Sequence, residues 1–325
     1  MTATIPPTRA LSAGNGTPVA GGQAPARRRP DAGPWHAWKR RLPLMPALAY
    51  MIVVTQVPFL VTLWYSLRSW NLLVPGSNRF AGLAEYRAAF DDPAFRSAAL
   101  NTLKITASAV VLAMLLGVAL ALLLNRKFLG RGVVRTMLIT PFLLMPVATD
   151  LLFKTTIYDS NFGFLDWVLR PLGVGQVNWL GTHAVGSLVV VLVWEWAPFM
   201  MLIVLAGLQG EDLEALEAAR VDGANAVKTF TYITLPHIRR YIELGVLLGS
   251  IYIVQTFGDI YVLTAGGPGT ATTNLPYYLY EQVFNNFTVG VGAAAGVIVV
   301  ILTEVVATFA LRLFSGLLEA SAGAV

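Results

Sequence analysis

The chain has 325 residues, of which 56% are hydrophobic and only 13% are charged. A soluble domain of this length is about a quarter charged, so much of this apolar surplus must face lipid. The net charge of +5 comes from basic residues scattered between apolar stretches, which excludes a nucleic-acid-binding patch. The chain has no cysteine, and its three histidines lie in separate segments without metal-ligand spacing, so we predict no metal site.

The first predicted segment, residues 1–40, is rich in Gly, Ala, Pro, Thr and Arg and has no apolar periodicity. Such a composition cannot bury enough surface to offset chain entropy, so we predict a disordered basic tail. A signal peptide is a competing interpretation, but the apolar stretch that follows is too long and lacks a cleavage site. Residues 41–325 are predicted to form one membrane domain.

Six apolar stretches of 22 to 24 residues follow the tail. At a rise of about 1.5 Å per residue, each is long enough to cross a hydrocarbon core of about 30 Å as a helix. The ten-residue alternation typical of a membrane β-barrel is missing. The sequence therefore predicts an all-α membrane protein with six transmembrane helices, at residues 44–67, 101–124, 136–157, 185–208, 242–263 and 290–313.

Lys and Arg are distributed unequally between the connections. With the N-terminus in the cytoplasm, sixteen of them fall on the cytoplasmic side and five in the outer connections. Because cytoplasmic loops are enriched in these residues, we predict a multi-pass protein with both termini in the cytoplasm.

The long cytoplasmic connection, residues 209–240, carries the most informative pattern. Residues 211–220 are strong helix formers, and Asp222 and Gly223 follow as a turn. A second amphipathic helix is predicted after the turn, and Pro236 is expected to stop or kink it before the next span.

Two short helices with a small-residue turn make a knob that fits a groove on a partner. Glu217 and Asp222 supply charge for basic side chains of that partner, and close backbone approach is permitted by Ala218, Ala219, Gly223 and Ala224. The alternative is an amphipathic helix lying on the membrane surface. Interfacial helices favour Lys and Arg, whereas the first of these helices is acidic, so the docking interpretation is preferred.

This connection resembles the EAA loop of ATP-binding-cassette (ABC) importer permeases. The resemblance rests on Glu217-Ala218-Ala219, Asp222-Gly223-Ala224, Phe230, Ile233 and Leu235-Pro236. It implies that the connection is the coupling helix of a type I importer permease and docks into a cleft on the ATP-hydrolysing subunit.

The likeness extends along most of the chain to the maltose-type carbohydrate permeases. It is carried by Pro46, Pro58, Tyr65-Ser66-Leu67, Asn101-Thr102, and the stretches at 194–199, 206–208 and 263–268. Residues 55–60 and 69–72 look most like permeases for sugar alcohols. The resemblance implies a translocated sugar or polyol, a paralogous second permease subunit, two ATP-binding subunits and an extracytoplasmic solute-binding protein.

ATP hydrolysis is expected in a separate subunit, which would also bind the ATP and magnesium. A P-loop needs a lysine directly after a glycine, and none of the five lysines has that position. We therefore predict that this chain is not an enzyme and carries no cofactor of its own.

Polar residues inside the predicted spans indicate a solute pathway, because charges at membrane depth are costly. Glu195 lies in the fourth span between two tryptophans, Trp196 being one of them. Carboxylates bind sugar hydroxyls and aromatic faces stack on sugar C–H surfaces. A structural role against a neighbouring helix or the second permease subunit is the alternative for Glu195.

On the fifth span, Tyr252, Gln255 and Asp259 have helical spacing and are expected on one face, lining a pathway or a subunit interface. In the third span, Asp150 and Lys154 are four residues apart and are expected to pair with each other.

Three other functions stay open on the sequence alone. They are an ion-gradient-driven secondary transporter, an ABC importer for glycerol-phosphate-type solutes, and a membrane scaffold without transport activity. The sequence does not identify the particular sugar or polyol.

Overall fold

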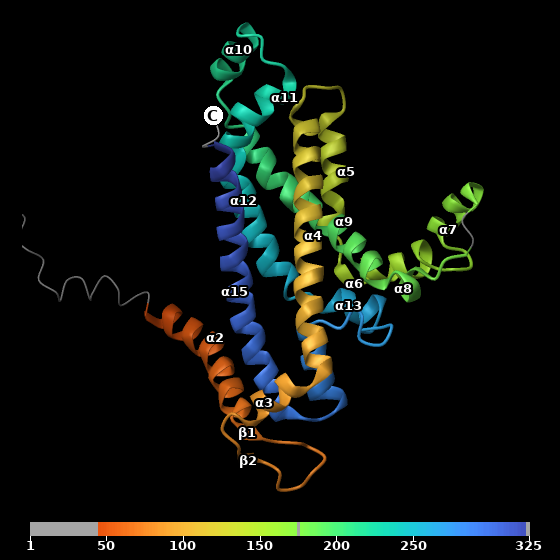
Figure 1. Ribbon diagram of the computed structural model, residues 1–325, viewed down its shortest axis with the longest axis vertical. Coiled ribbons are helices and arrows are strands. Elements are labelled where there is room, and N and C mark those ends of the chain that lie inside the picture. The colour runs from red at the N-terminus through yellow and green to blue at the C-terminus, as the bar shows by residue number, and fades with distance from the viewer. Residues whose placement is uncertain (1–44, 174–175, 323–325) are drawn as a thin grey trace, which may run out of the picture. The chain divides into compact units, whose positions relative to one another are not determined.

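The computed structural model describes residues 45–173 and 176–322 (Figure 1), so the tail predicted at residues 1–40 lies outside the described part. The chain divides into two units after Val57. The described part of the first unit is the beginning of helix α2 (Met45–Ser66), and the second unit begins at Pro58 within the same helix. A proline inside a helix removes one backbone hydrogen bond, which weakens the helix at this boundary.

The all-α membrane fold class predicted from the sequence is confirmed, because most of the described residues are helical. Within them, four helices are long and apolar enough to cross a membrane, and a fifth span is added if one bent helix pair counts as a single crossing. The four are α2, α4 (Pro93–Asn125), α9 (Ala184–Leu208) and α15 (Val289–Ala322), and the bent pair is α5 (Arg131–Leu143) followed by α6 (Pro146–Leu152) with the π-helix η2 (Phe153–Ile157).

The third predicted span is not a continuous helix. α5 and α6 meet at a bend of 97°. Met145 has φ −67° and ψ 122°, an extended conformation, because the ring of Pro146 disfavours the helical conformation of the residue before it. The sequence correctly placed apolar helix here, and the prediction of one straight crossing over 136–157 was wrong.

The fifth predicted span is also displaced and broken. Its main helix, α12 (Leu235–Ile253), begins seven residues earlier than predicted and contains Pro236 in its first turn, so this proline does not stop the helix. α12 ends at Ile253, and a short helix α13 (Gly258–Leu263) follows. The first half of α12 contains Arg239, Arg240 and Glu243, and these charges explain why α12 is not among the apolar spans.

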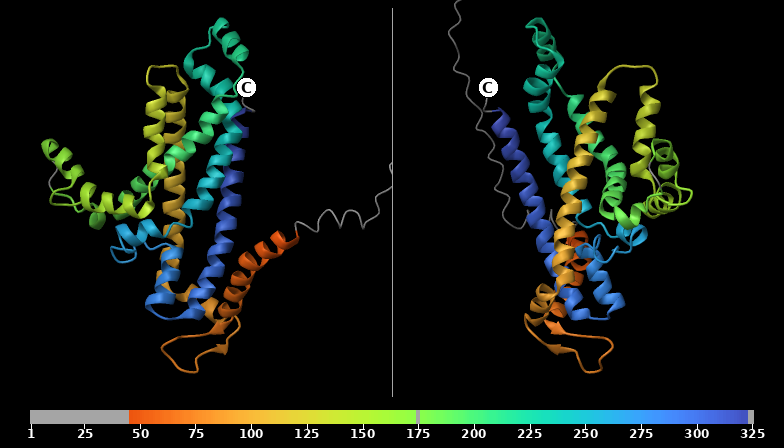
Figure 2. Two further views of the ribbon diagram at one scale, coloured as in Figure 1. Left: turned by 180° about the vertical axis from the view of Figure 1, so that it is seen from behind. Right: turned by 45° about the vertical axis from the view of Figure 1, so that its right-hand side comes forward.

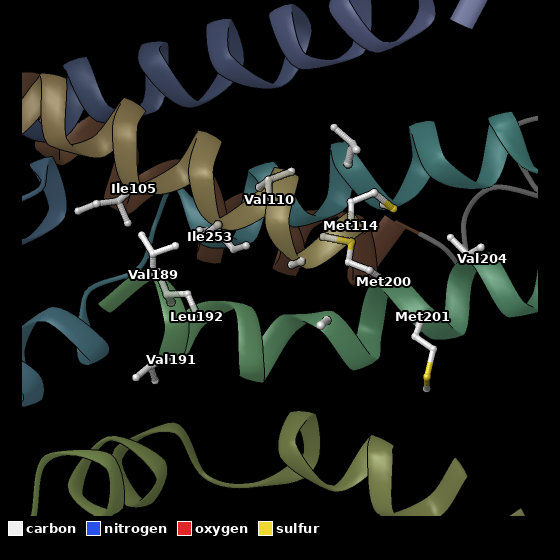
Figure 3. Packing of buried hydrophobic residues seen from close by; sticks show 14 of the residues in the cluster. Ile105, Val110, Met114, Val189, Val191, Leu192, Met200, Met201, Val204 and Ile253 are labelled. Atoms are coloured by element: carbon white, nitrogen blue, oxygen red, sulfur yellow. The ribbon is translucent and has the colours of Figure 1, made fainter. Parts of the chain in front are cut away.

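Four helices of the second unit form the core. α9 packs against α4 and α12, and α12 packs against α4 and α15 (Figures 1 and 2). Figure 3 shows Met114 of α4 and Met200 of α9 facing each other between these helices. Gly117 permits the close approach, because a Cβ at this position would lie 2.7 Å from the Met200 Cβ.

Two groups of the remaining elements lie at opposite ends of this core, whereas α7 (Phe164–Leu169) and α8 (Trp179–Thr182) lie at its side (Figures 1 and 2). One end carries the two strands, β1 (Arg68–Ser69) paired antiparallel with β2 (Arg79–Phe80). The same end carries α3 (Ala84–Asp91), α14 (Leu275–Tyr280) and the π-helix η5 (Glu281–Asn285). The loop end carries α10 (Leu213–Val221), α11 (Ala226–Thr229) and the π-helix η4 (Phe230–Thr234), together with the connection between α4 and α5. The two connections predicted to be cytoplasmic therefore lie at the same end.

A partly buried hydrogen bond joins α14 to the start of α4. The Tyr278 hydroxyl donates to the Asp92 Oδ2 at 2.7 Å, while the Asp92 Oδ1 caps α4 by accepting from the backbone N–H of Ala94. Burial and the neighbouring Asp92 carboxylate both raise the pKa of Tyr278.

Replacing Tyr278 with phenylalanine is expected to destabilise the protein by about 1.5–3 kcal/mol, since a hydrogen bond to a charged group is lost. Thermal unfolding of the purified protein in detergent measures this change. Tyr232→Phe removes the hydroxyl of an exposed tyrosine and is expected to leave the unfolding temperature unchanged. Equal unfolding temperatures for the parent and Tyr278→Phe would contradict the account.

Candidate functional site

The connection between α9 and α12 folds into a helical hairpin whose turn depends on one glycine. The Asp212 side chain caps α10 by accepting from the backbone N–H of Glu214 at 2.9 Å. At the other end, the Gly223 N–H bonds to the Arg220 carbonyl, and the Ala224 N–H bonds to the Ala219 carbonyl. This is a Schellman motif, and Gly223 occupies its left-handed position with φ +76°.

The hairpin exposes most, but not all, of the residues that the sequence predicted for docking. Glu217, Ala218, Asp222 and Gly223 are exposed, Ala224 is half-buried, and Ala219 is buried. Sequence reasoning missed that α10 and α11 also expose large apolar side chains, among which Val221 is 87% exposed. The others are Leu213 and Val227. A small, acidic and partly apolar knob of this kind is suited to a complementary groove.

The base of the hairpin is fixed to both helices that it joins. The Nε2 atom of His237 in α12 lies 3.0 Å from the Gly207 carbonyl oxygen in α9. The ring of Tyr241 packs directly on Gly207, where a Cβ would lie 2.5 Å from the ring. The base of the hairpin therefore holds the ends of α9 and α12 in direct contact.

An aromatic cluster lies farther along these same two helices. The rings of Trp196 in α9 and Tyr252 in α12 stack with centroids 5.4 Å apart at an angle of 22°. Phe142 of α5 and Phe199 of α9 pack around Trp196, with centroids 5.8 Å away in both cases. Tyr252 is 55% exposed, so one side of the stack is open. The sequence singled out Trp196 and Tyr252 but gave no reason to bring Phe142 to them.

The three polar residues predicted on one face of the fifth span do not share a helix. Tyr252 lies in the last turn of α12, Gln255 in the exposed break and Asp259 in the first turn of α13. The break is stabilised by the Thr256 hydroxyl, which donates to the Asp259 Oδ2 at 2.7 Å. Such local side-chain bonds compete with continuous helix, so the expected common face was wrong.

Glu195 and Asp259 nevertheless lie together, a contact that the sequence did not predict. The bend after α12 turns Asp259 toward α9, where it interacts directly with the buried Glu195. Asp150 of α6 is close enough to interact with both carboxyl groups. We call Asp150, Glu195 and Asp259 the acidic cluster.

The pairing expected between Asp150 and Lys154 is absent, which corrects the sequence-based prediction. The Lys154 ammonium instead donates to the backbone carbonyl of Val262 at 2.6 Å, in the last turn of α13. A cation at a helix C-terminus is favoured by the unsatisfied carbonyls there. Neither carboxylate oxygen of Asp150 has a hydrogen-bond partner among the described residues.

The connection that follows η2 carries a further carboxylate, at Asp159. Its Oδ1 atom accepts from the backbone N–H groups of Phe162 and Asn161, and these bonds lower the pKa of Asp159. Farther along, the Trp179 Nε1 donates to the buried Asp166 carboxylate at 2.7 Å. These three bonds stabilise the turns of this connection.

Residues 98–319 match the sequence profile of the family described as "binding-protein-dependent transport system inner membrane component". The chain belongs to this family. It is therefore a multi-pass inner-membrane permease that works with a solute-binding protein, as the hairpin between α9 and α12 suggested.

Individual relatives agree with this assignment. A probable ABC transporter permease of Sinorhizobium fredii is 38% identical over 84% of this chain and 89% of the relative. The trehalose/maltose transport system permease of Thermococcus litoralis is 33% identical over 80% of this chain and 88% of the relative. In fold, the chain is similar to a bacterial alginate ABC transporter solved with an alginate-bound periplasmic protein, with a TM-score of 0.73, 21% identity, and coverage of 85% of this chain and 93% of that chain.

Proposed function

We propose that this chain is the permease subunit of an ABC importer that translocates a carbohydrate, either a sugar or a polyol. The observation that carries the proposal is the half-open Trp196–Tyr252 stack, which lies on the two helices joined by the coupling hairpin. Aromatic faces flanked by carboxylates are suited to the C–H faces and hydroxyl groups of a carbohydrate. The named substrate of the trehalose/maltose relative supports the same class.

In this proposal the solute pathway runs past Trp196 and Tyr252, with Glu195, Gln255 and Asp259 supplying polar contacts. The Gln255 side chain is exposed in the break between α12 and α13, where its Nε2 donates to the Ile251 carbonyl at 2.9 Å. Its amide oxygen stays available to a solute hydroxyl. Non-helical backbone at membrane depth is tolerated where it lines a cavity or is covered by protein, which fits this break.

The hairpin that contains Glu217, Ala218, Ala219, Asp222, Gly223 and Ala224 is proposed as the coupling element. It would dock on an ATP-binding partner, which holds the ATP and magnesium. Closure of two such partners would move the hairpin, and the fixed base at Gly207 and His237 would carry the movement to α9 and α12. Both termini would lie in the cytoplasm, and a paralogous permease would complete the pathway.

Replacing Trp196 with alanine is expected to raise the KM for the transported solute by up to about tenfold, since one aromatic contact contributes about 0.5–1.5 kcal/mol. Uptake kinetics of the reconstituted complex measure this change. The exposed Trp167 lies outside the proposed pathway, so Trp167→Ala is the control and should leave KM unchanged. Equal KM values for all three proteins would exclude Trp196 from the pathway.

The test of the proposed function is ATP hydrolysis by the purified complex in lipid, with its binding protein and a panel of sugars and polyols. Stimulation by one of them supports the proposal and identifies the solute. Stimulation only by a glycerol phosphate would replace the carbohydrate with that class. A complex that purifies without an ATPase and responds to an ion gradient would favour a secondary transporter.

A further inference from the structure

The acidic cluster contains oxygen atoms that nothing in the described structure satisfies. Asp150 is fully buried, and both of its carboxylate oxygens lack a hydrogen-bond partner there. The Asp259 Oδ1 and the hydroxyl of the neighbouring Thr149 are likewise buried without a partner. A buried polar group without a partner costs about 1–3 kcal/mol, and a charged group costs more. The three carboxyl oxygens of Asp150 and Asp259 therefore lack a hydrogen-bond donor among the described residues.

The nearby basic group does not supply that donor. Lys154 is one turn from Asp150, but its ammonium is bound to the Val262 carbonyl. A metal ion is not indicated either, because no group of three or more His, Cys, Asp or Glu side chains in the described ranges is placed to hold one. A solute that reaches the cluster from the translocation pathway would supply such donors through its hydroxyl groups.

The location of the cluster specifies the chemistry of that molecule. Its members come from α6, α9 and α13, and Glu195 directly precedes Trp196, whose ring stacks on Tyr252. A solute that contacts the Trp196 ring therefore lies next to the segment of α9 that carries Glu195. A carboxyl group accepts hydrogen bonds whether it is ionised or protonated, so solute hydroxyl groups are suitable donors in either state.

We propose that Asp150, Glu195 and Asp259 together form a binding site that accepts hydrogen bonds from the hydroxyl groups of an uncharged sugar or polyol and rejects anionic carbohydrates. The inference rests on the proposed function and makes it more specific. Asp150 enters as a further specificity-determining residue, since the sequence had assigned it only to a structural pair.

Rejection of anions follows from the same geometry. A carboxylate, sulfonate or phosphate on the solute would lose its water beside three carboxyl groups. Like charges at short range repel, and a buried charge without a cationic partner is costly even when the neighbouring groups are neutral. Lys154 lies one helical turn from Asp150, but its ammonium is bound to the Val262 carbonyl of α13 instead of to the cluster.

The test uses the full complex of this chain with its ATPase and binding-protein partners in proteoliposomes. ATP-driven uptake is first measured for D-glucitol, D-mannitol, trehalose and maltose, and for the acids D-gluconate and D-glucuronate. The preferred solute is then measured with Asp150→Asn, with Asp150→Glu and with Glu304→Gln, which alters an exposed acid of α15 outside the cluster. Saturation-transfer NMR on the complex without binding protein reports solute contact independently of turnover.

An uncharged solute is expected to be preferred by the parent. Asp150→Asn should raise the KM for this solute on the order of tenfold with little change in kcat. It should also weaken the saturation-transfer NMR signal of the solute and lower the ratio of its uptake to the uptake of the acids. Asp150→Glu should lie between the parent and Asp150→Asn, and Glu304→Gln should match the parent.

Three results would overturn the inference. A preference for an acid would contradict the site but leave the carbohydrate importer standing. Variants of Asp150 that match Glu304→Gln, or that lose assembly of the complex rather than solute affinity, would assign Asp150 to packing or to a subunit contact. Uptake of none of the six solutes would contradict the site and the proposed function together.

Discussion

Replacing Gly223 with proline is expected to reduce solute transport on the order of tenfold or more, while the complex still hydrolyses ATP. Proline fixes φ near −65°, whereas Gly223 has φ +76° and closes the end of α10 through its N–H. The variant therefore loses both the left-handed turn and one hydrogen bond of the Schellman motif. Transport and ATP hydrolysis are measured on the same proteoliposomes, so that their ratio reports coupling.

The chain offers a matched control for this change. Gly130, between α4 and α5, also has a left-handed backbone (φ +83°) and open space around it, and it lies at the same end of the core. Gly130→Pro imposes the same backbone conflict outside the hairpin and should preserve the ratio. Glu217→Lys, which alters only an exposed charge, should lower the ratio as Gly223→Pro does. Parental transport by either hairpin variant would show that another element couples the subunits.

The largest loss of stability is expected from Gly117→Val in α4. A Cβ at this position would lie 2.7 Å from the Met200 Cβ and 2.9 Å from the Met201 backbone nitrogen, so α4 and α9 must separate. Overpacking of this kind costs about 1–3 kcal/mol, and a clash with backbone lies at the upper end of that range. The expected result is a lower unfolding temperature in detergent, because the core packing between α4 and α9 shown in Figure 3 is weakened.

Gly132→Val separates this clash from the effect of valine in a helix. Gly132 lies in α5, and nothing lies within 4 Å of a Cβ built there. The control variant is expected to unfold at the parental temperature or slightly above it, because valine forms helix better than glycine. If both variants unfolded at the same temperature, close α4–α9 packing would not limit stability.

The apolar pattern was sufficient to predict the helical membrane fold, because lipid-facing helices need little more than length and hydropathy. It did not reveal where those helices break. The breaks at Met145 and after Ile253 depend on local groups: Pro146 restricts its neighbour, and Thr256 bonds to Asp259. Hydropathy averages over both places, so continuous spans were predicted.

The candidate sites were predictable to different degrees. The coupling hairpin is local in sequence, so its helices and its turn at Gly223 could be located before the structure was known. The acidic cluster joins Asp150, Glu195 and Asp259 across more than a hundred residues, through the two breaks that the sequence did not show. The helical spacing of Asp150 and Lys154 predicted a pair that does not form, because the Lys154 ammonium binds a carbonyl of α13 instead.

A single arrangement connects these sites. α9 carries Glu195 and Trp196, α12 carries Tyr252, and the hairpin joins the two helices at their ends. Because the hairpin base holds the ends of both helices, movement of the hairpin is expected to displace Trp196 and Tyr252 together. In the proposed function, this link converts closure of the ATP-binding partners into opening or closing of the solute pathway.

The most direct test of the central claim is solute uptake into proteoliposomes that contain the complex, with binding protein and labelled solute on one side and ATP on the other. The account predicts that uptake requires ATP and the binding protein and persists when ionophores dissipate all ion gradients. Uptake that proceeds without ATP and stops when an ionophore is added would contradict it.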